Sequence, residues 1–129
     1  MQYLLKKTDK LRFKSDFDYV RQNGVKYVGS SLVLVVAPPP DEALRCGVIC
    51  GKKFNHRAVV RNRARRLLWE SFRLLKPAVC AGRLVMIPRK RIIARKQPEV
   101  QRELQDLLRQ AGLWHDGRHA AIRPTTCSD

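Results

Sequence analysis

The feature that most restricts the fold of this chain is a long amphipathic segment between two short apolar segments. Residues 58–76 repeat apolar side chains at helical spacing, and Pro77 ends the pattern. The flanking segments 46–51 and 83–88 are short, apolar and bounded by glycine or basic residues, which is typical of strands. A strand, a helix and a strand in this order form a crossover connection, so the sequence predicts a mixed α/β fold.

One further strand is clear in the sequence. Segment 31–37 is almost entirely apolar and rich in β-branched residues, and the three prolines that follow end it because proline donates no ladder hydrogen bond. We expect segment 46–51 to pair with it as a hairpin. Tyr27 can lie in an additional short strand.

Two more helices complete the pattern. The first is predicted over 16–22, with Ser15 as its N-cap and Gly24 just past its last turn. The last begins near Pro98, a residue favoured in the first helical turn, and ends before Gly112. The predicted order is therefore α-β-β-α-β-α, with the strand at Tyr27 as an optional addition.

The length and hydropathy predict one domain outside the membrane. The 129 residues match a single domain, which we place at 1–112, followed by a tail over 113–129 that lacks periodicity and is expected to be disordered. The longest apolar run, 32–37, is far shorter than the roughly 18 residues that span a bilayer, and the first residues lack a signal-peptide core. We expect a cytoplasmic protein with no membrane partner.

Charge predicts the class of partner. The chain carries 27 Lys and Arg against 11 Asp and Glu, a formal net charge of +16. Segment 52–73 alone holds eight of the basic residues and one acid, Glu70. A folded basic face that binds a polyanion such as nucleic acid explains this concentration, whereas a merely solvated basic helix is the alternative.

The sequence shows no catalytic or metal-binding constellation. It lacks a G-x-S-x-G motif and a phosphate-binding glycine loop, and its four cysteines have no C-x-x-C spacing. A protein nuclease needs carboxylates to hold divalent metals, and the basic segment offers only Glu70. We therefore predict no catalytic residue and no metal ligand, and a chain that binds nucleic acid without cutting it unaided.

The densest motif is Arg61-Asn62-Arg63 followed by Arg65-Arg66, with Lys52-Lys53 upstream across a short loop. Arginine and lysine can neutralise phosphates, and an asparagine amide can hydrogen-bond a phosphate, a sugar or a base edge. This strand, loop and helix, with KK at 52–53, RNRARRL at 61–67 and ESFR at 70–73, resembles the signature of the protein subunit of bacterial ribonuclease P. The resemblance extends from about Lys7 to Gly112.

The resemblance implies a fold and a role. The fold is an α/β sandwich like the second domain of ribosomal protein S5, with a left-handed βαβ crossover through the Arg-Asn-Arg helix. The role is to join a catalytic RNA, in a 1:1 complex, and to help it remove the 5′ leader of precursor tRNA. The RNA and substrate are expected to hold the Mg²⁺ ions of the hydrolysis.

The resemblance also implies two groups of site residues. The expected RNA-binding residues are Lys52, Lys53, Arg57, Arg61, Asn62, Arg63, Arg65 and Arg66. A cleft between the first helix and the sheet is expected to bind the precursor leader, with these residues at or beside it: Phe13, Phe17, Arg61, Asn62 and Arg65.

A structural RNA-binding protein of the ribosome is the alternative, because it would share the small size, the high charge and the lack of catalysis. The spacing from Lys-Lys to Arg-Asn-Arg in a strand, loop and helix favours the ribonuclease P subunit.

Overall fold

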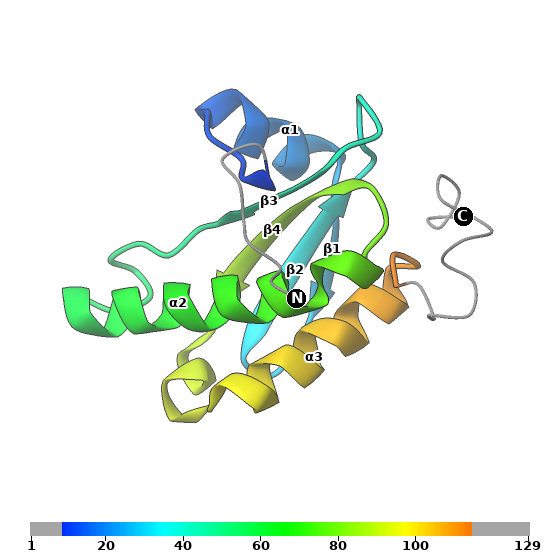
Figure 1. The fold of residues 1–129 in the computed structure, drawn as a ribbon. Helices are drawn as coiled ribbons and strands as arrows, with labels where there is room; N and C mark the ends of the chain where they lie inside the picture. The colour runs from blue at the N-terminus through cyan, green and yellow to red at the C-terminus, as the bar shows by residue number, and fades with distance from the viewer. Residues whose placement is uncertain (1–8, 115–129) are drawn as a thin grey trace.

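The computed structural model describes residues 9–114, which fold as three α-helices around a four-stranded sheet (Figure 1). In chain order the main elements are α1 (Lys14–Asn23), β1 (Val25–Val28), β2 (Leu32–Ala37), β3 (Leu44–Val48), α2 (Ala58–Leu75), β4 (Gly82–Pro88) and α3 (Gln97–Gln110). Two short 3-10 helices follow α2 and β4, namely η2 (Lys76–Ala78) and η3 (Lys90–Ala94). The predicted element order is confirmed, and Tyr27 lies in the additional strand β1.

The strands are ordered β1-β2-β4-β3, so one predicted pairing is wrong. We expected β2 and β3 to form a hairpin, but β4 lies between them, antiparallel to β2 and parallel to β3. β2 and β4 are nearly continuous apolar runs that are buried on both faces, so they take the two central positions. β3 is more polar and occupies an edge.

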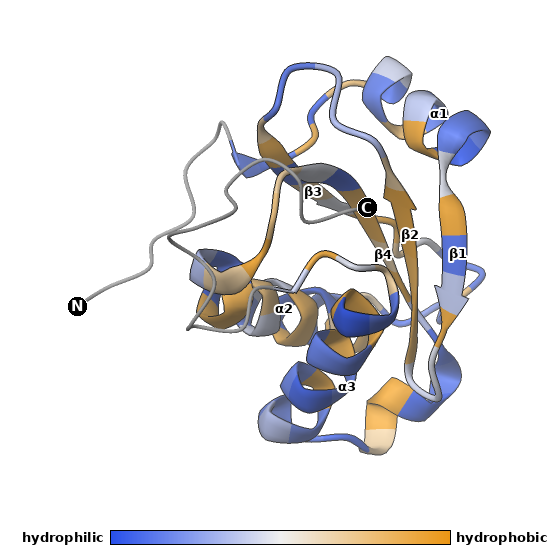
Figure 2. Ribbon diagram, turned by 90° about the vertical axis from the view of Figure 1, so that its right-hand side faces the viewer, coloured by the Kyte–Doolittle hydropathy of each residue, from blue (hydrophilic) through white to orange (hydrophobic). Residues whose placement is uncertain are grey.

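The sheet is covered on both faces, which confirms the predicted sandwich (Figure 2). Alternate side chains of the central strands point to opposite faces. Leu34 and Met86 face the larger core under α2 and α3, whereas Val20 of α1 packs with Val35 and Val85 on the other face.

The start of α1 differs from the prediction. The helix begins at Lys14, and the carboxylate of Asp16 accepts a hydrogen bond from the backbone N–H of Phe13 at 3.1 Å, so Ser15 is not the cap. Gly24 follows the last turn as expected, and the structure leaves no room for a side chain at this position. A Cβ there would lie 2.4 Å from the carbonyl oxygen of Val20 and 2.6 Å from Cγ1 of Val35.

The helical periodicity of α2 predicts an apolar stripe, with Phe72 at its flank, formed by Val60, Ala64, Leu67, Leu68, Ser71 and Leu75. Ala64, Leu68, Ser71 and Leu75 are buried as predicted, whereas Val60 and Leu67 are only partly buried. Phe72 is completely buried, because the helix packs against α3 as well as the sheet and so hides a wider face.

The chain remains part of the fold for two residues beyond the predicted domain end. Gly112 adopts a φ of 76° and ends the α3 region as predicted. Leu113, which we assigned to the tail, is buried, and its carbonyl accepts the N–H of Cys80 at 2.8 Å; Trp114 bridges to Val79. Residues 115–129 of the predicted tail lie outside the described residues.

One carboxylate fastens α3 to the turn between β1 and β2. Glu103 accepts hydrogen bonds from the hydroxyls of Ser30 and Ser31 at 2.8 Å and from the backbone N–H groups of Ser31 and Leu32 at 2.9 and 3.0 Å. Burial disfavours the ionised form, but these hydrogen bonds outweigh it and lower the pKa of Glu103 below its usual value.

We expect Glu103→Gln to lower the free energy of unfolding by about 1 to 3 kcal/mol at neutral pH, because hydrogen bonds to a charged acceptor are the stronger ones. A carboxyl with a depressed folded-state pKa stabilises the protein above its unfolded pKa and loses that effect as pH falls through the folded one. The difference between the two proteins in urea unfolding should therefore shrink as the pH falls below the usual carboxyl range. Asp106→Asn is the control, because Asp106 is exposed on the same helix and has no hydrogen bond or ion pair among residues 9–114; an equal loss in both variants contradicts this role.

Candidate nucleic-acid interface

The basic loop starts where β3 ends. A turn closes with a hydrogen bond from the N–H of Phe54 to the carbonyl of Gly51 at 3.0 Å, and it leaves Lys52 and Lys53 exposed. The side-chain oxygen of Asn55 then accepts the N–H of Arg57 at 2.9 Å, one residue before α2 begins. Local hydrogen bonds therefore shape the loop that leads into the Arg-Asn-Arg helix.

Arg61 and Arg65 attach this loop to the helix. The Arg61 guanidinium donates to the carbonyls of Asn55 and His56 at 3.0 and 2.8 Å. Arg65 donates to the carbonyl of Cys50 at 2.7 Å and to the side-chain oxygen of Asn62 at 3.1 Å. Loop carbonyls lack partners in regular secondary structure, and these guanidinium groups supply them.

Arg63 makes an equivalent connection on another side of α2. Its guanidinium donates to the carbonyls of Ile93 and Arg95 at 3.2 and 2.9 Å. It thereby holds η3 against the helix, and η3 carries Lys90 and Arg91, which are exposed. The basic surface thus extends from α2 to the 3-10 helix that follows β4, an extension that our sequence analysis did not include. The adjacent basic run at 89–91 was the available signal.

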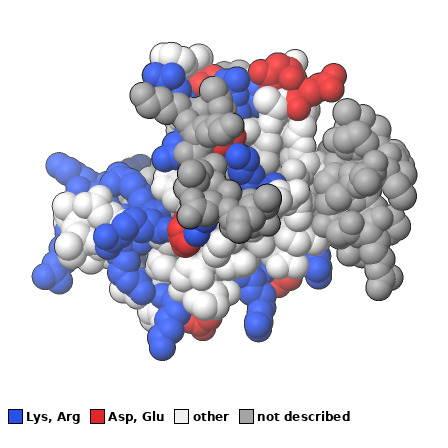
Figure 3. Space-filling model, in the orientation of Figure 1, with Lys and Arg blue, Asp and Glu red and all other residues white. Residues whose placement is uncertain are grey.

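Four of the predicted residues keep their charged groups unengaged. Within residues 9–114, the side chains of Lys52, Lys53, Arg57 and Arg66 form no hydrogen bond or ion pair, and all four are exposed. Figure 3 shows the resulting concentration of Lys and Arg over the first half of α2. These are the groups best placed to neutralise phosphates, and we call the surface formed by residues 52–66 of the loop and helix the α2 basic surface.

Cys50 lies beside the α2 basic surface, in contact with Arg61 and Arg65, but it is buried and offers no nucleophile. Burial raises the pKa of its thiol above the usual value, although Arg65 and Arg61 act in the opposite direction. The thiol is therefore neutral at physiological pH.

A cleft of about 250 Å³ lies between α1 and the opposite face of the sheet. Phe17 lines it together with Val35 and Ile49, and Arg21 and Lys26 add positive charge. The half-buried ring of Phe17 lies against Gly47, where a Cβ would be 2.5 and 2.6 Å from two ring carbons. Glycine in β3 therefore permits the close approach of this aromatic ring.

The structure separates the residues that we grouped around this cleft. Phe17 is among the lining residues, whereas Phe13 is 63% exposed and has the Arg12 guanidinium 5.7 Å from its ring centroid. Arg61, Asn62 and Arg65 lie on α2 and do not line the cleft. Arg65 is connected to the cleft through the chain. Its guanidinium donates to the carbonyl of Cys50, the residue that follows the lining residue Ile49.

The donor atoms of this part of the molecule do not suit a resident Mg²⁺ ion, which prefers carboxylate and carbonyl oxygens. Glu70 is the one acid of α2, and Arg73 engages it through two hydrogen bonds, which lower the pKa of the carboxyl. Across residues 9–114, no group of three or more His, Cys, Asp and Glu side chains is placed to hold a metal. The same residues include no helix long and apolar enough to cross a membrane.

Known proteins of one family are similar to this chain. The family model described as Ribonuclease P matches residues 5–112. A ribonuclease P protein component of Chloroflexus aggregans is 37% identical over 111 residues, which cover 84% of this chain and 82% of the relative. One from Herpetosiphon aurantiacus is 34% identical over 113 residues, covering 87% and 91% of the two chains.

Solved structures share the fold. The ribonuclease P protein from Thermotoga maritima is 26% identical with a TM-score of 0.69, covering 78% of this chain and 96% of that one. The one from Staphylococcus aureus has a TM-score of 0.73 at 21% identity, covering 83% and 98%. At that identity the second likeness shows the fold alone.

Proposed function

Because the chain belongs to the family of ribonuclease P protein components and is a subunit that serves tRNA 5′ maturation, we propose that it binds the RNA of that enzyme through the α2 basic surface. The observation that carries the proposal is that the basic residues form two groups, one bound to backbone carbonyls and one without partners among residues 9–114. Arg61, Arg63 and Arg65 shape the surface by binding backbone carbonyls. The cations of four further residues have no hydrogen-bond or ion-pair partner among residues 9–114 and are available to phosphates, namely Lys52, Lys53, Arg57 and Arg66.

We further propose that the RNA, with Mg²⁺ held by RNA and substrate phosphates, performs the hydrolysis. Support comes from the chemistry of the described residues, where Arg73 engages the carboxylate of Glu70 on α2 and the thiol of Cys50 is buried, with a raised pKa. The role of the protein is then to bind and orient RNA, in one copy per RNA, in the cytoplasm. The ribosomal alternative is not favoured, since the family model and the relatives are ribonuclease P components.

The cleft beside Phe17 is our proposed site for the 5′ leader. A single strand requires an aromatic or apolar platform together with nearby positive charge, and the cleft offers Phe17 with Arg21 and Lys26. Since Arg61, Asn62 and Arg65 do not line it, their part in leader binding would be limited to the end of the cleft near Cys50.

Reconstitution tests the proposed function. We expect the purified chain to increase 5′-leader removal by a bacterial ribonuclease P RNA at low Mg²⁺, and to cleave no precursor tRNA without that RNA. Leader removal is measured on a labelled precursor transcript. A basic protein of similar charge, such as a ribosomal protein, is the control. Equal stimulation by that control, or cleavage by the chain after rigorous removal of RNA, contradicts the proposal.

A further inference from the structure

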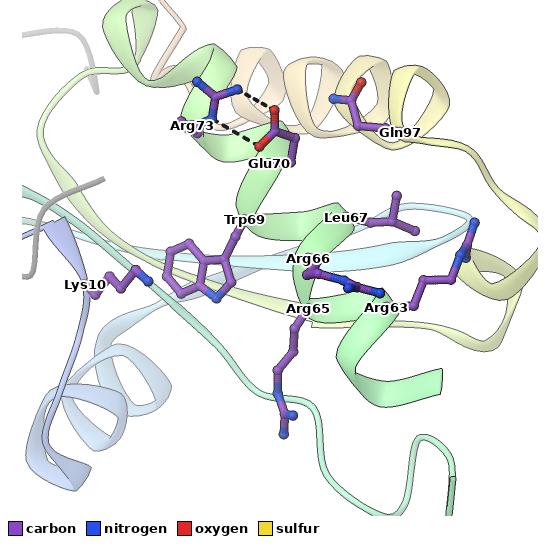
Figure 4. A pocket seen from close by; sticks show the side chains of 9 residues that line it. All are labelled: Lys10, Arg63, Arg65, Arg66, Leu67, Trp69, Glu70, Arg73 and Gln97. Carbon is purple, nitrogen blue, oxygen red and sulfur yellow. Dashed lines mark hydrogen bonds and ion pairs between the residues drawn. The ribbon is translucent and has the colours of Figure 1, made fainter. Parts of the chain in front are cut away.

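A second hollow, on the exposed side of α2, has a tryptophan, Trp69, in its wall. The hollow has a volume of about 500 Å³, and the residues important here are Lys10, Arg66, Leu67, Trp69, Glu70 and Arg73 (Figure 4). It lies next to the α2 basic surface, because Arg66 and Trp69 are three residues apart on one helix and therefore neighbours on its surface.

The Trp69 ring is held in place from two directions. The Phe72 ring meets it edge-on, with centroids 6.2 Å apart and an interplanar angle of 74°. The ammonium of Lys10 lies 4.7 Å from its centroid. The ring is nevertheless only partly buried and forms part of the wall of the hollow. The ring is thus held in place before any ligand arrives, which reduces the entropy lost on binding, and a base that stacks on the face under Lys10 displaces that flexible side chain.

The charges around the ring favour an anionic ligand. Arg66 has no hydrogen-bond or ion-pair partner among the described residues, and in Figure 4 its side chain lies on the Arg63 side of α2, away from the Trp69 ring. The acid in the wall, Glu70, is engaged by Arg73, so its negative charge is compensated. A ligand that lies along this side of α2 meets an aromatic ring and, about one helical turn away, a guanidinium without a partner among residues 9–114.

We propose that Trp69 stacks on an unpaired base of an RNA strand whose adjacent phosphate is bound by Arg66. The proposal rests on the proposed function in that RNA is the partner. A fixed aromatic ring beside arginine is the arrangement with which proteins bind bases of single-stranded RNA, since every base offers a π-face. A duplex keeps its bases stacked inside, so the site selects a loop, a bulge or a single strand.

Two RNAs could supply the base, namely the ribonuclease P RNA and the precursor tRNA, and binding is therefore measured with each. Trp69→Leu is expected to weaken binding of one of them by about 5- to 150-fold, the range for loss of one stacked base. Because no charge is removed, the slope of log K against log salt should remain unchanged. Trp69→Phe keeps an aromatic ring and should lose less affinity than Trp69→Leu.

Fluorescence gives an independent measurement. The chain has two tryptophans, so Trp114→Phe leaves Trp69 as the only one. Ribonuclease P RNA or precursor tRNA should quench Trp69 emission in this variant, whereas heparin, a polyanion without bases, should not. Thermal unfolding of each variant shows whether it remains folded, and the comparison of Trp69→Phe with Trp69→Leu applies even if both lose some stability.

Three results would overturn the proposal: equal affinity of Trp69→Leu and the parent protein for both RNAs, equal losses in Trp69→Leu and Trp69→Phe, or equal quenching by heparin. Failure of the proposed function would look different, because the parent protein would then bind RNA without increasing leader removal.

Discussion

Replacing Lys52, Lys53 and Arg66 together by glutamine is expected to weaken binding of ribonuclease P RNA by on the order of 10²- to 10³-fold at about 0.1 M salt. Each phosphate contact releases counterions and contributes close to one unit to the slope of log K against log salt. The slope should therefore fall by about two to three. Stability should change little, because these side chains are exposed and have no partner within residues 9–114.

The matched control removes the same charge elsewhere. Lys14 on α1, and Arg102 and Arg109 on α3, are also exposed, and their replacement by glutamine lowers the net charge equally. A filter-binding or anisotropy titration at several salt concentrations compares the two triple variants. If the control loses as much affinity and slope as the test variant, overall charge rather than the α2 basic surface binds the RNA.

Phe17→Ala is expected to change both stability and leader recognition. The ring packs against Gly47 and belongs to the apolar cluster under α1. Since it is half-buried, its removal should lower the free energy of unfolding by about 2 to 3 kcal/mol, below the range for a fully buried phenylalanine. Loss of a platform in the cleft should also lower the affinity for precursor with a long leader by about 5- to 150-fold relative to leaderless tRNA.

Leu11→Ala separates the two effects. Leu11 is buried in the same cluster but does not line the cleft, so its truncation should reduce stability without changing the ratio of the two affinities. Urea unfolding and binding to the two RNAs are measured for both variants. An unchanged ratio in Phe17→Ala would assign the ring to packing alone.

The local elements could be predicted because their causes are local. The periodicity of α2, the proline after it and the prolines after β2 depend on neighbours in the chain, and each element occurs within a few residues of its predicted position. Strand pairing could not be predicted in this way. Periodicity shows that 46–51 is apolar, yet the insertion of β4 between β2 and β3 results from the burial of two apolar strands on both faces.

By itself, the sequence determined that this is a basic α/β protein with a Lys-Lys loop entering an Arg-Asn-Arg helix, since composition and spacing carry that information directly. Only the tertiary structure decided which basic residues are available to RNA. Arg61, Arg63 and Arg65 look equivalent to Arg66 in the sequence, but packing brings the carbonyls of residues 50, 55, 56, 93 and 95 to the first three, whereas no carbonyl of residues 9–114 reaches Arg66. A loop carbonyl that has no backbone partner requires another hydrogen-bond donor. Which arginine supplies that donor depends on contacts between residues as many as 32 positions apart in the chain.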